Sequence, residues 1–270
     1  GTPVAGFVFG MEVQSIGRIR YEGIIPCLVA AYVGDLTTRW WGAAHSHYPH
    51  LANLEIEPGL LIKVAIAAVA FGLTSTLFVE LTHAIKALQA RYIPYPPLRP
   101  VIGGAAIVAL TLLFGTTDYL GLSLPLIQQS VNGTGVVTFA FLLKLIFTAI
   151  TLGSGFLGGE VTPLFVIGST LGSTVGTLLG VDPAFMAALG FVAVFAGASN
   201  TPLACALMGI ELFGGGSPLY LILGCVIAYL VSGHRGIYHT QRIDSPKYSG
   251  VLVLQDESLR AFAERHRTRK

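Results

Sequence analysis

Long apolar runs separated by short polar stretches dominate this chain. About 20 residues cross the hydrocarbon core of a bilayer, so runs that approach this length are candidate membrane-spanning helices. The pattern predicts such segments at residues 24–41, 60–81, 101–114, 136–152, 161–179, 183–198 and 219–231. Several are too short to cross alone, and glycine or proline interrupts or precedes them. Half-helices that meet at the membrane midplane have this pattern.

The polar stretches between these runs predict loops, at residues 45–58, 89–100 and 116–135. After about residue 240 the chain becomes charged, and it ends in a basic cluster. We expect a membrane domain at residues 1–240 and a short tail at 241–270. The tail is predicted to be cytoplasmic, because basic residues are retained on that side of a membrane. Residues 256–267 could form a short surface helix within it.

One short element occurs twice, at residues 1–12 and 200–211. Each copy contains Thr-Pro near its start and ends in Gly-x-Glu, which is Gly-Met-Glu in the first copy and Gly-Ile-Glu in the second. About ten residues reach only half way across a bilayer, so each copy is predicted to be a half-helix. Glu12 and Glu211 end the two copies. Their matching positions suggest a shared architectural task, such as binding backbone N–H groups of a neighbour. The first copy starts at the first residue, so we expect that the chain lacks the helices preceding it.

The composition agrees with a membrane protein: 53% of residues are hydrophobic, only 11% are charged and the mean hydropathy is +0.71. A soluble domain would carry about a quarter charged residues. Cys27, Cys205 and Cys225 lie in apolar runs without metal-type spacing, so they are interpreted as small buried hydrophobic residues. We expect the lipid bilayer as a partner, and neither a cofactor, nor a bound metal, nor nucleic acid.

The segment at residues 153–163, Gly-Ser-Gly-Phe-Leu-Gly-Gly-Glu-Val-Thr-Pro, carries the most chemistry. Its glycines free the backbone to fold tightly, and the apolar run after Pro163 is predicted to be a helix. Backbone N–H groups at such a helix start, with the helix dipole behind them, bind anions without a cationic side chain. A glycine-rich crossover that serves only packing is the alternative.

Glu160 favours the functional interpretation of this segment. An ionisable carboxyl group in the apolar part of a membrane protein costs roughly 3 kcal/mol or more, and it is a functional candidate by default. Proton transfer is the expected role of Glu160. A simple partner for the helix dipole is the alternative interpretation.

Other polar clusters have weaker signals. Glu80 and His83 share a helix face, and an interfacial position is favoured over a proton relay. Three histidines lie close together but lack the acidic or cysteine partners of a zinc site, so we expect a solvated loop there. They are His45, His47 and His50.

These features together resemble the CLC family, the voltage-gated chloride channel family that includes anion/proton antiporters. The resemblance rests on the repeated elements, on the segment at residues 159–163, and on Tyr238 in the late sequence Gly-Ile-Tyr. From spacing alone, Tyr238 would be an interface-belt tyrosine. The resemblance covers nearly all of this chain but only the later part of a CLC subunit. It implies an all-α, polytopic, inverted-repeat membrane fold that is N-terminally incomplete, without the segment that holds the family's gating glutamate.

The resemblance also implies roles for particular residues. Gly159 begins the segment that matches the family's anion site, where Glu160 and Val161 would present backbone N–H groups to the anion. Tyr238 would contribute its hydroxyl group. Chloride/proton exchangers of the family carry a second glutamate at the position of Val13, so the usual internal proton route is in doubt here.

The departures from the common pattern are similar to the fluoride/proton antiporter branch of the family. That branch lacks the internal glutamate and carries a glutamate and a threonine in the anion segment, as Val13, Glu160 and Thr162 do together. Fluoride is small and strongly hydrated, so its binding demands strong donors. The Thr162 hydroxyl and a protonated Glu160 could supply two of them.

The resemblance therefore implies a homodimeric fluoride/proton antiporter of a bacterial inner (plasma) membrane that exports fluoride and is not an enzyme. A chloride channel or chloride/proton exchanger of the same fold is the main alternative. A remote alternative is an intramembrane serine protease that uses Ser154 with His234 or His239, although both histidines follow the last apolar run.

Overall fold

The structure of the chain is a computed structural model that describes residues 1–43, 45–249, 251, 253, 254 and 257–267. Within these residues the chain is mostly helical, as the sequence predicts. The helices and strands are α1 Pro3–Glu12, β1 Ser15–Ile16, η1 Tyr21–Gly23, α2 Ile24–Trp40, α3 Pro58–Tyr92, α4 Leu98–Phe114, α5 Leu124–Val131, α6 Ala140–Gly153, α7 Val161–Leu179, α8 Pro183–Ser199, α9 Pro202–Phe213, α10 Pro218–Val231, β2 Arg242–Ile243 and α11 Leu259–Arg267.

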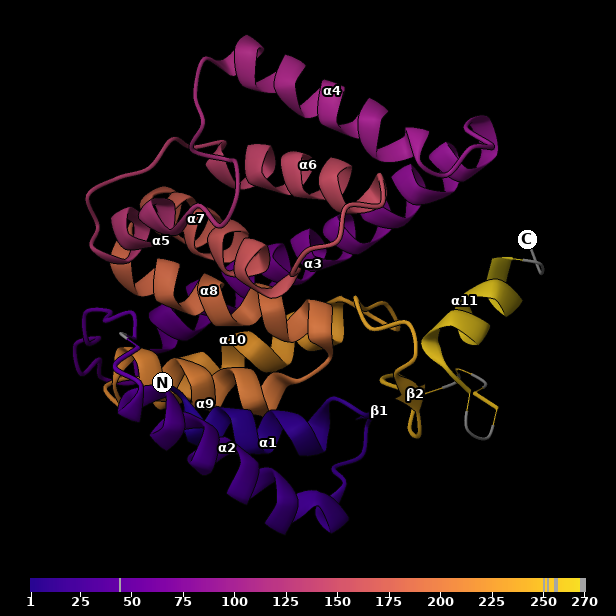
Figure 1. Ribbon diagram of the computed structural model, residues 1–270. Coiled ribbons are helices and arrows are strands. Elements are labelled where there is room, and N and C mark those ends of the chain that lie inside the picture. The colour runs from indigo at the N-terminus through magenta and orange to yellow at the C-terminus, as the bar shows by residue number, and fades with distance from the viewer. Residues whose placement is uncertain (44, 250, 252, 255–256, 268–270) are drawn as a thin grey trace.

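Helices α7 and α8 lie at the centre of the molecule (Figure 1), and most residues of α8 are buried. Helices α3 and α10 pack against α8. Helices α4 and α6 lie at one end, whereas α1, α2 and α9 lie at the other (Figure 1). In the described part of the chain, α3 and α7 are the helices long and apolar enough to cross a membrane alone. Several others are apolar but have 10–17 residues, which agrees with the predicted half-helices.

Glycines allow α7 and α8 to pack with their backbones in contact. Gly168 and Gly172 face the backbone of α8, and a Cβ atom on either would collide with the carbonyl group of Gly190 or Met186. Gly176 follows at the same four-residue spacing, where a Cβ would lie 2.9 Å from the Met186 Cβ. Small residues at this spacing let helices approach closely in lipid. The glycine pattern therefore fixes the position of α7, including its first turn.

The two copies of the repeated element, α1 and α9, hold each other reciprocally. The Glu211 carboxylate, near the end of α9, accepts hydrogen bonds from the N–H groups of Val4 (3.0 Å) and Ala5 (2.7 Å) at the start of α1. The Glu12 carboxylate, at the end of α1, accepts bonds from Leu203 (3.1 Å) and Ala204 (2.8 Å) at the start of α9. The predicted shared task is confirmed. Each carboxylate satisfies N–H groups that a first helical turn leaves without partners.

The stretch at residues 116–135 differs from the predicted loop, because α5 forms within it. The helix begins after Ser123, which has a positive φ of 55°. Lys144 on α6 fixes this turn: its Nζ donates to the carbonyl oxygens of Tyr119 (3.1 Å) and Gly121 (2.7 Å) and to the Ser123 hydroxyl (2.8 Å). Only 1% of Lys144 is exposed. A side chain from a distant helix thus organises the segment, which the local sequence does not reveal.

Helix α3 is longer than predicted, since it begins at Pro58 and continues to Tyr92 instead of ending at residue 81. Its second half carries Glu80 and His83, and it continues into the range predicted as the loop at 89–100. The apolar pattern fades there because this half is less enclosed by other helices. Gln89 nevertheless donates to the Ser154 hydroxyl at 2.7 Å, so it contacts the glycine-rich segment after α6.

The chain after α10 packs back onto the end of α1. Strand β2 pairs in parallel with β1, with Ser15 opposite Arg242 and Ile16 opposite Ile243. A small apolar cluster forms around this pair, from Ile16, Ile243, Leu259 and Phe262. Helix α11 lies within the predicted surface helix at 256–267, although residue 256 itself is outside the described residues.

Candidate functional site

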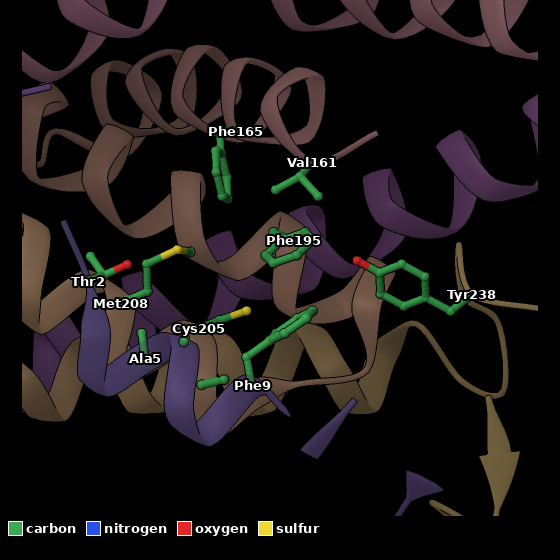
Figure 2. A pocket seen from close by; sticks show the side chains of 11 residues that line it. Thr2, Ala5, Phe9, Val161, Phe165, Phe195, Cys205, Met208 and Tyr238 are labelled. Atoms are coloured by element: carbon green, nitrogen blue, oxygen red, sulfur yellow. The ribbon is translucent and has the colours of Figure 1, made fainter. Parts of the chain in front are cut away.

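An apolar cavity of about 220 Å³ lies between α1, the start of α7, α8 and α9. Its walls are mostly aromatic and aliphatic. Figure 2 shows the Tyr238 hydroxyl pointing into the space beside Val161 and Phe195. The lining residues are Thr2, Ala5, Gly6, Phe9, Val161, Phe165, Phe195, Ala204, Cys205, Met208 and Tyr238. The cavity therefore combines an apolar wall with a few polar groups, which is typical of a ligand site.

A second, larger hollow of about 680 Å³ adjoins it, which we call the polar vestibule. Its lining residues are Phe9, Val13, Gln14, Ser15, Arg20, Tyr238, Thr240, Gln241 and Arg242. Phe9 and Tyr238 line both spaces, with ring centroids 6.4 Å apart and ring planes at 72°. These two rings therefore form the boundary between the vestibule and the apolar cavity.

Helix α7 begins beside this boundary. Glu160 is the residue before its first turn, and Val161 and Phe165 point from α7 toward the cavity. The first N–H group of α7 that bonds within the helix is that of Leu164, which donates to the Glu160 carbonyl oxygen at 3.2 Å. The N–H groups of Val161 and Thr162 therefore precede the helical hydrogen-bond ladder, and Pro163 has none. Two N–H groups and a helix dipole at one point are the arrangement that the sequence analysis expects of an anion site.

Two polar side chains at this helix start have no hydrogen-bond partner among the described residues. They are the Glu160 carboxylate and the Thr162 hydroxyl, and both residues are half-buried. Glu160 interacts electrostatically with Lys86 on α3 and with Tyr238. Both residues are partly exposed, so a ligand or water can satisfy these polar groups.

The glycines before α7 have different reasons to be glycine. Gly155 has a φ of +91°, which residues other than glycine rarely adopt. Gly153 packs against α3, and a Cβ there would lie 2.7 Å from the Ile85 Cγ2. A Cβ on Gly159, by contrast, would meet nothing within 4 Å. The packing interpretation of this segment therefore applies to Gly153, whereas Gly159 has no packing role.

The predicted site residues do not all lie in one space. Val161 and Tyr238 share the apolar cavity, and Glu160 is electrostatically coupled to Tyr238. Gly159 lines another cavity, of about 220 Å³, between α6 and the turn before α5. Thr162 is on the first turn of α7 but lines neither of these cavities.

Sequence reasoning missed two residues of the site region. Phe9 lies inside the repeated element, where nothing distinguishes it from other apolar residues, yet it lines both the cavity and the vestibule. Lys144 lines the cavity that contains Gly159. A lysine within a predicted membrane span is a functional candidate by default, so its charge was a signal available in the sequence.

The residues of the remote protease alternative are not assembled. The Ser154 hydroxyl accepts its hydrogen bond from Gln89 and contacts no histidine in the described part of the chain. His234 Nε2 accepts a hydrogen bond from the N–H of Lys247 at 3.0 Å, and the His239 ring packs against that of His83 in a tilted arrangement, with ring centroids 4.1 Å apart. A serine protease requires its base within hydrogen-bond reach of the nucleophile.

The histidines at positions 45, 47 and 50 lie in the long connection before α3. His45 Nε2 lies 3.7 Å from the Asp35 carboxylate. No group of three side chains suited to a metal occurs in the part of the chain that the structure describes.

The fold and the site define a class of protein: a polytopic helical membrane protein with paired, interrupted helices around a central cavity. A family model described as voltage gated chloride channel matches residues 1–233. The chain therefore belongs to the CLC family of voltage-gated chloride channels, whose members include channels and anion/proton transporters.

Individual relatives agree with this assignment. The "Chloride/fluoride channel protein" of Pseudomonas syringae pv. tomato is 44% identical over 258 residues, which are 93% of this chain and 57% of the relative. The "H(+)/Cl(-) exchange transporter ClcA" of Yersinia pestis is 23% identical over 93% of this chain and 54% of its own. A crystal structure of a CLC-type fluoride/proton antiporter superposes with a TM-score of 0.87 at 33% identity, covering 90% of this chain and 62% of that one. The chain thus spans somewhat more than half the length of these relatives.

Proposed function

We propose that this chain forms the later part of a CLC-type fluoride/proton antiporter that exports fluoride. The supporting observation is the start of α7, where the Glu160 carboxylate and the Thr162 hydroxyl have no hydrogen-bond partner among the described residues and lie beside the N–H groups of Val161 and Thr162. The Pseudomonas syringae relative carries fluoride in its name, and the superposed crystal structure is of a fluoride/proton antiporter.

The chemistry of fluoride suits this helix start. Releasing water from a small anion requires several strong donors close together, and hydroxyl groups and helix N–H groups are such donors. We propose that Val161 and Thr162 provide N–H groups, that the Thr162 and Tyr238 hydroxyls donate, and that Gly159 leaves the space needed for approach. The aromatic wall of the apolar cavity cannot solvate the anion, so these few donors determine selectivity.

Glu160 is proposed to transfer the proton. Its carboxyl group can accept a proton as the carboxylate and can donate a hydrogen bond to the anion once it is protonated. Val13 lines the polar vestibule at the position where chloride/proton exchangers of the family carry their internal glutamate. With an aliphatic residue there, the proton requires another carrier between the vestibule and the cavity. Glu160 interacts electrostatically with Tyr238, which lies at the boundary between these two spaces.

The test uses a chimera, in which this chain is fused behind the part of the Pseudomonas syringae relative that precedes the matched region. Reconstituted in liposomes, the chimera should show fluoride efflux that drives proton uptake. Glu160→Gln keeps the size of the side chain but cannot titrate, so proton coupling should fall at least tenfold. Thr162→Val should instead raise the fluoride KM.

Lys63→Gln on α3 is the matched control, because it lies about 35 Å along the same helix from Lys86, at a rise of about 1.5 Å per residue. It should leave both fluoride flux and coupling unchanged. Fluoride flux with unaltered proton coupling in Glu160→Gln would exclude the proposed proton role.

Chloride transport by a channel or exchanger of the same fold is the second candidate. The mostly apolar cavity wall and the similarity to a named chloride exchange transporter favour it. The chimera assay distinguishes the two directly: equal or faster chloride flux under the same gradient would favour chloride over fluoride as the substrate.

We also propose a homodimer in a bacterial inner membrane, with residues 1–240 as the membrane domain, residues 241–270 in the cytoplasm, and no enzymatic activity. The resemblance to the family supports the dimer. The basic composition of the tail supports its orientation. Native mass spectrometry of the chimera should give twice the subunit mass, and a C-terminal green fluorescent protein fusion should fluoresce in cells.

A further inference from the structure

A buried carboxamide, that of Gln241, joins three segments beside the polar vestibule. Gln241 lines this space but is only 3% exposed. Its Nε2 donates to the carbonyl oxygens of Val13 (2.8 Å), just after α1, and of Ser199 (3.1 Å), at the end of α8. Its Oε1 accepts a bond from the Asn200 Nδ2 at 2.9 Å. Both donor hydrogens and the acceptor oxygen of this carboxamide are therefore used.

Gln241 is also bonded to the residue whose ring closes the vestibule. Its backbone N–H donates to the Tyr238 carbonyl oxygen at 3.1 Å, so these two residues form the ends of one turn. On the other side of Tyr238, the Asn200 Nδ2 donates to the Arg235 carbonyl oxygen at 3.0 Å. Residues 232–241 are all described and form no helix or strand. Individual hydrogen bonds, rather than regular secondary structure, therefore hold the Tyr238 backbone.

A continuous chain of hydrogen bonds connects the two rings at the boundary of the vestibule. The Val13 N–H donates to the Phe9 carbonyl oxygen at 2.9 Å, one helical turn earlier on α1. The Gln241 side chain then bonds the Val13 carbonyl, and the Gln241 backbone bonds Tyr238. The Phe9 and Tyr238 ring centroids lie 6.4 Å apart. Gln241 is thus the side chain that links the backbone of one ring to the backbone of the other.

The Asn200 amide is held in the orientation that Gln241 requires. Lys247 Nζ donates to the Asn200 Oδ1 at 2.6 Å, and an ammonium group can only donate, so the Asn200 Nδ2 is the atom left to face Gln241. Asn200 is 2% exposed. Gly236 leaves room for the amide, since a Cβ there would lie 2.6 Å from the Asn200 Nδ2. The partners of Gln241 are therefore fixed on every side.

We propose that Gln241 is a positioning residue that sets the separation of the Phe9 and Tyr238 rings, and that it thereby controls passage between the polar vestibule and the apolar cavity. The proposal rests on the proposed function in one respect, namely that the transported anion crosses this boundary.

A cysteine of the chain reports on this boundary. Cys205 lines the apolar cavity but not the vestibule, and it is 1% exposed. In the view of Figure 2, the Phe9 side chain lies between Cys205 and Tyr238. Cys225 is fully buried and lines neither space, so it reports on general loosening of the fold. The ratio of the two modification rates separates a local opening from partial unfolding.

The experiment measures thiol modification of the chain in detergent micelles. The reagent is sulfonatoethyl methanethiosulfonate, a water-soluble anion, and mass spectrometry of peptides gives the rate at each cysteine. Gln241→Met keeps the length of the side chain but removes its donors from Val13 and Ser199. The rate at Cys205 should rise about tenfold, while the rate at Cys225 stays unchanged. The control Gln14→Met replaces an exposed glutamine of the same vestibule and should leave both rates as in the parent.

Gly236→Ala keeps the test decisive if Gln241→Met does not fold. The added Cβ displaces the Asn200 amide from Gln241 without changing any charge, so it should also accelerate modification at Cys205 selectively. The proposal is overturned if Cys205 in a folded variant reacts as slowly as in the parent, or if Cys205 and Cys225 accelerate together. Rapid modification of Cys205 in the parent itself would also overturn it, because the boundary would then not be closed.

The consequence for transport is tested in the chimera. With a looser boundary, fluoride passes without waiting for the proton step, so Gln241→Met should lower the number of protons moved per fluoride, whereas Gln14→Met should keep the parent ratio. An unchanged ratio despite selective exposure of Cys205 would overturn the control of passage. If the unmodified chimera does not transport fluoride while Gln241→Met still exposes Cys205 selectively, the proposed function fails and the positioning role of Gln241 stands.

Discussion

At the scale of single residues, the chain treats its polar groups within the apolar region in two ways. Lys144 is fully enclosed, and all three of its N–H donors are used by carbonyl and hydroxyl oxygens. Glu160 and Thr162, at the start of α7, have no side-chain hydrogen bond to any residue that the structure describes. A satisfied group stabilises the fold, whereas an unsatisfied one beside a cavity is available for a ligand. This contrast separates the structural lysine from the candidate site.

The structural role of Lys144 can be tested by Lys144→Met, which has similar length but no donors. The substitution leaves two carbonyl groups and the Ser123 hydroxyl without their donor, so it should cost about 2–4 kcal/mol of stability. The apparent melting temperature in detergent should fall, as measured by the loss of the monodisperse peak after heating. Lys63→Met serves as the control and should melt like the parent. Equal melting of the two variants would contradict the assigned role.

At the scale of elements, two devices hold the interrupted helices in place. Gly168, Gly172 and Gly176 let α7 touch α8, which fixes where the start of α7 lies. Glu12 and Glu211 connect α1 and α9 at both ends, so the two short helices form one antiparallel unit. Short helices are only marginally stable alone, and these contacts add the stability that their length does not provide.

Each carboxylate of this unit should contribute separately. Glu12→Gln and Glu211→Gln each replace an acceptor of two N–H groups by an amide that accepts only one, at a cost of about 1–3 kcal/mol. The two sites lie about 15 Å apart along a ten-residue helix, so their effects should add. Melting temperatures of the single and double variants check this. Glu22→Gln, at an exposed position, should change nothing.

At the scale of the whole molecule, α1 and α2 reach the rest of the chain by a long connection, whose described residues, 43 and 45–57, form no helix. Tyr220 fixes the far end of this connection, since its hydroxyl donates to the Glu55 carbonyl (2.8 Å) and accepts the Glu57 N–H (3.1 Å). The attachment of α1 therefore rests on side-chain contacts with α9 and on the β1–β2 pair rather than on chain continuity.

Cutting the chain in this connection should not separate the pieces. With a protease site inserted after the exposed Gly42, the cleaved fragments should co-elute in size-exclusion chromatography in detergent. The same cut in the Glu12→Gln/Glu211→Gln variant should release the fragment that contains α1 and α2. Dissociation of the cut parent would show that the reciprocal carboxylates do not hold the unit.

Much of this molecule could be predicted from its sequence, because its signals are local. The repeated half-helices, their terminal glutamates and the helix after Pro163 each follow from residue type and spacing. Helix α5 could not be predicted, since Lys144 organises its first turn from 21 residues away. The bond between Lys247 and Asn200 was equally inaccessible, because Lys247 is an ordinary charged residue in a polar tail until the fold brings Asn200 to it.

The reciprocal carboxylates have a consequence for where an anion can bind. Each half of the molecule keeps a tethered negative charge in the N–H groups of the other half, as a permanent internal ligand. The starts of α1 and α9 are thereby occupied, whereas the start of α7 has no side-chain cap. Thr2, just before α1, lies in the wall of the apolar cavity that Val161 of α7 also lines. Removing Glu211 would therefore do more than loosen the fold. It would expose the N–H groups at the start of α1 as a second anion site, which would compete with the one proposed at the start of α7.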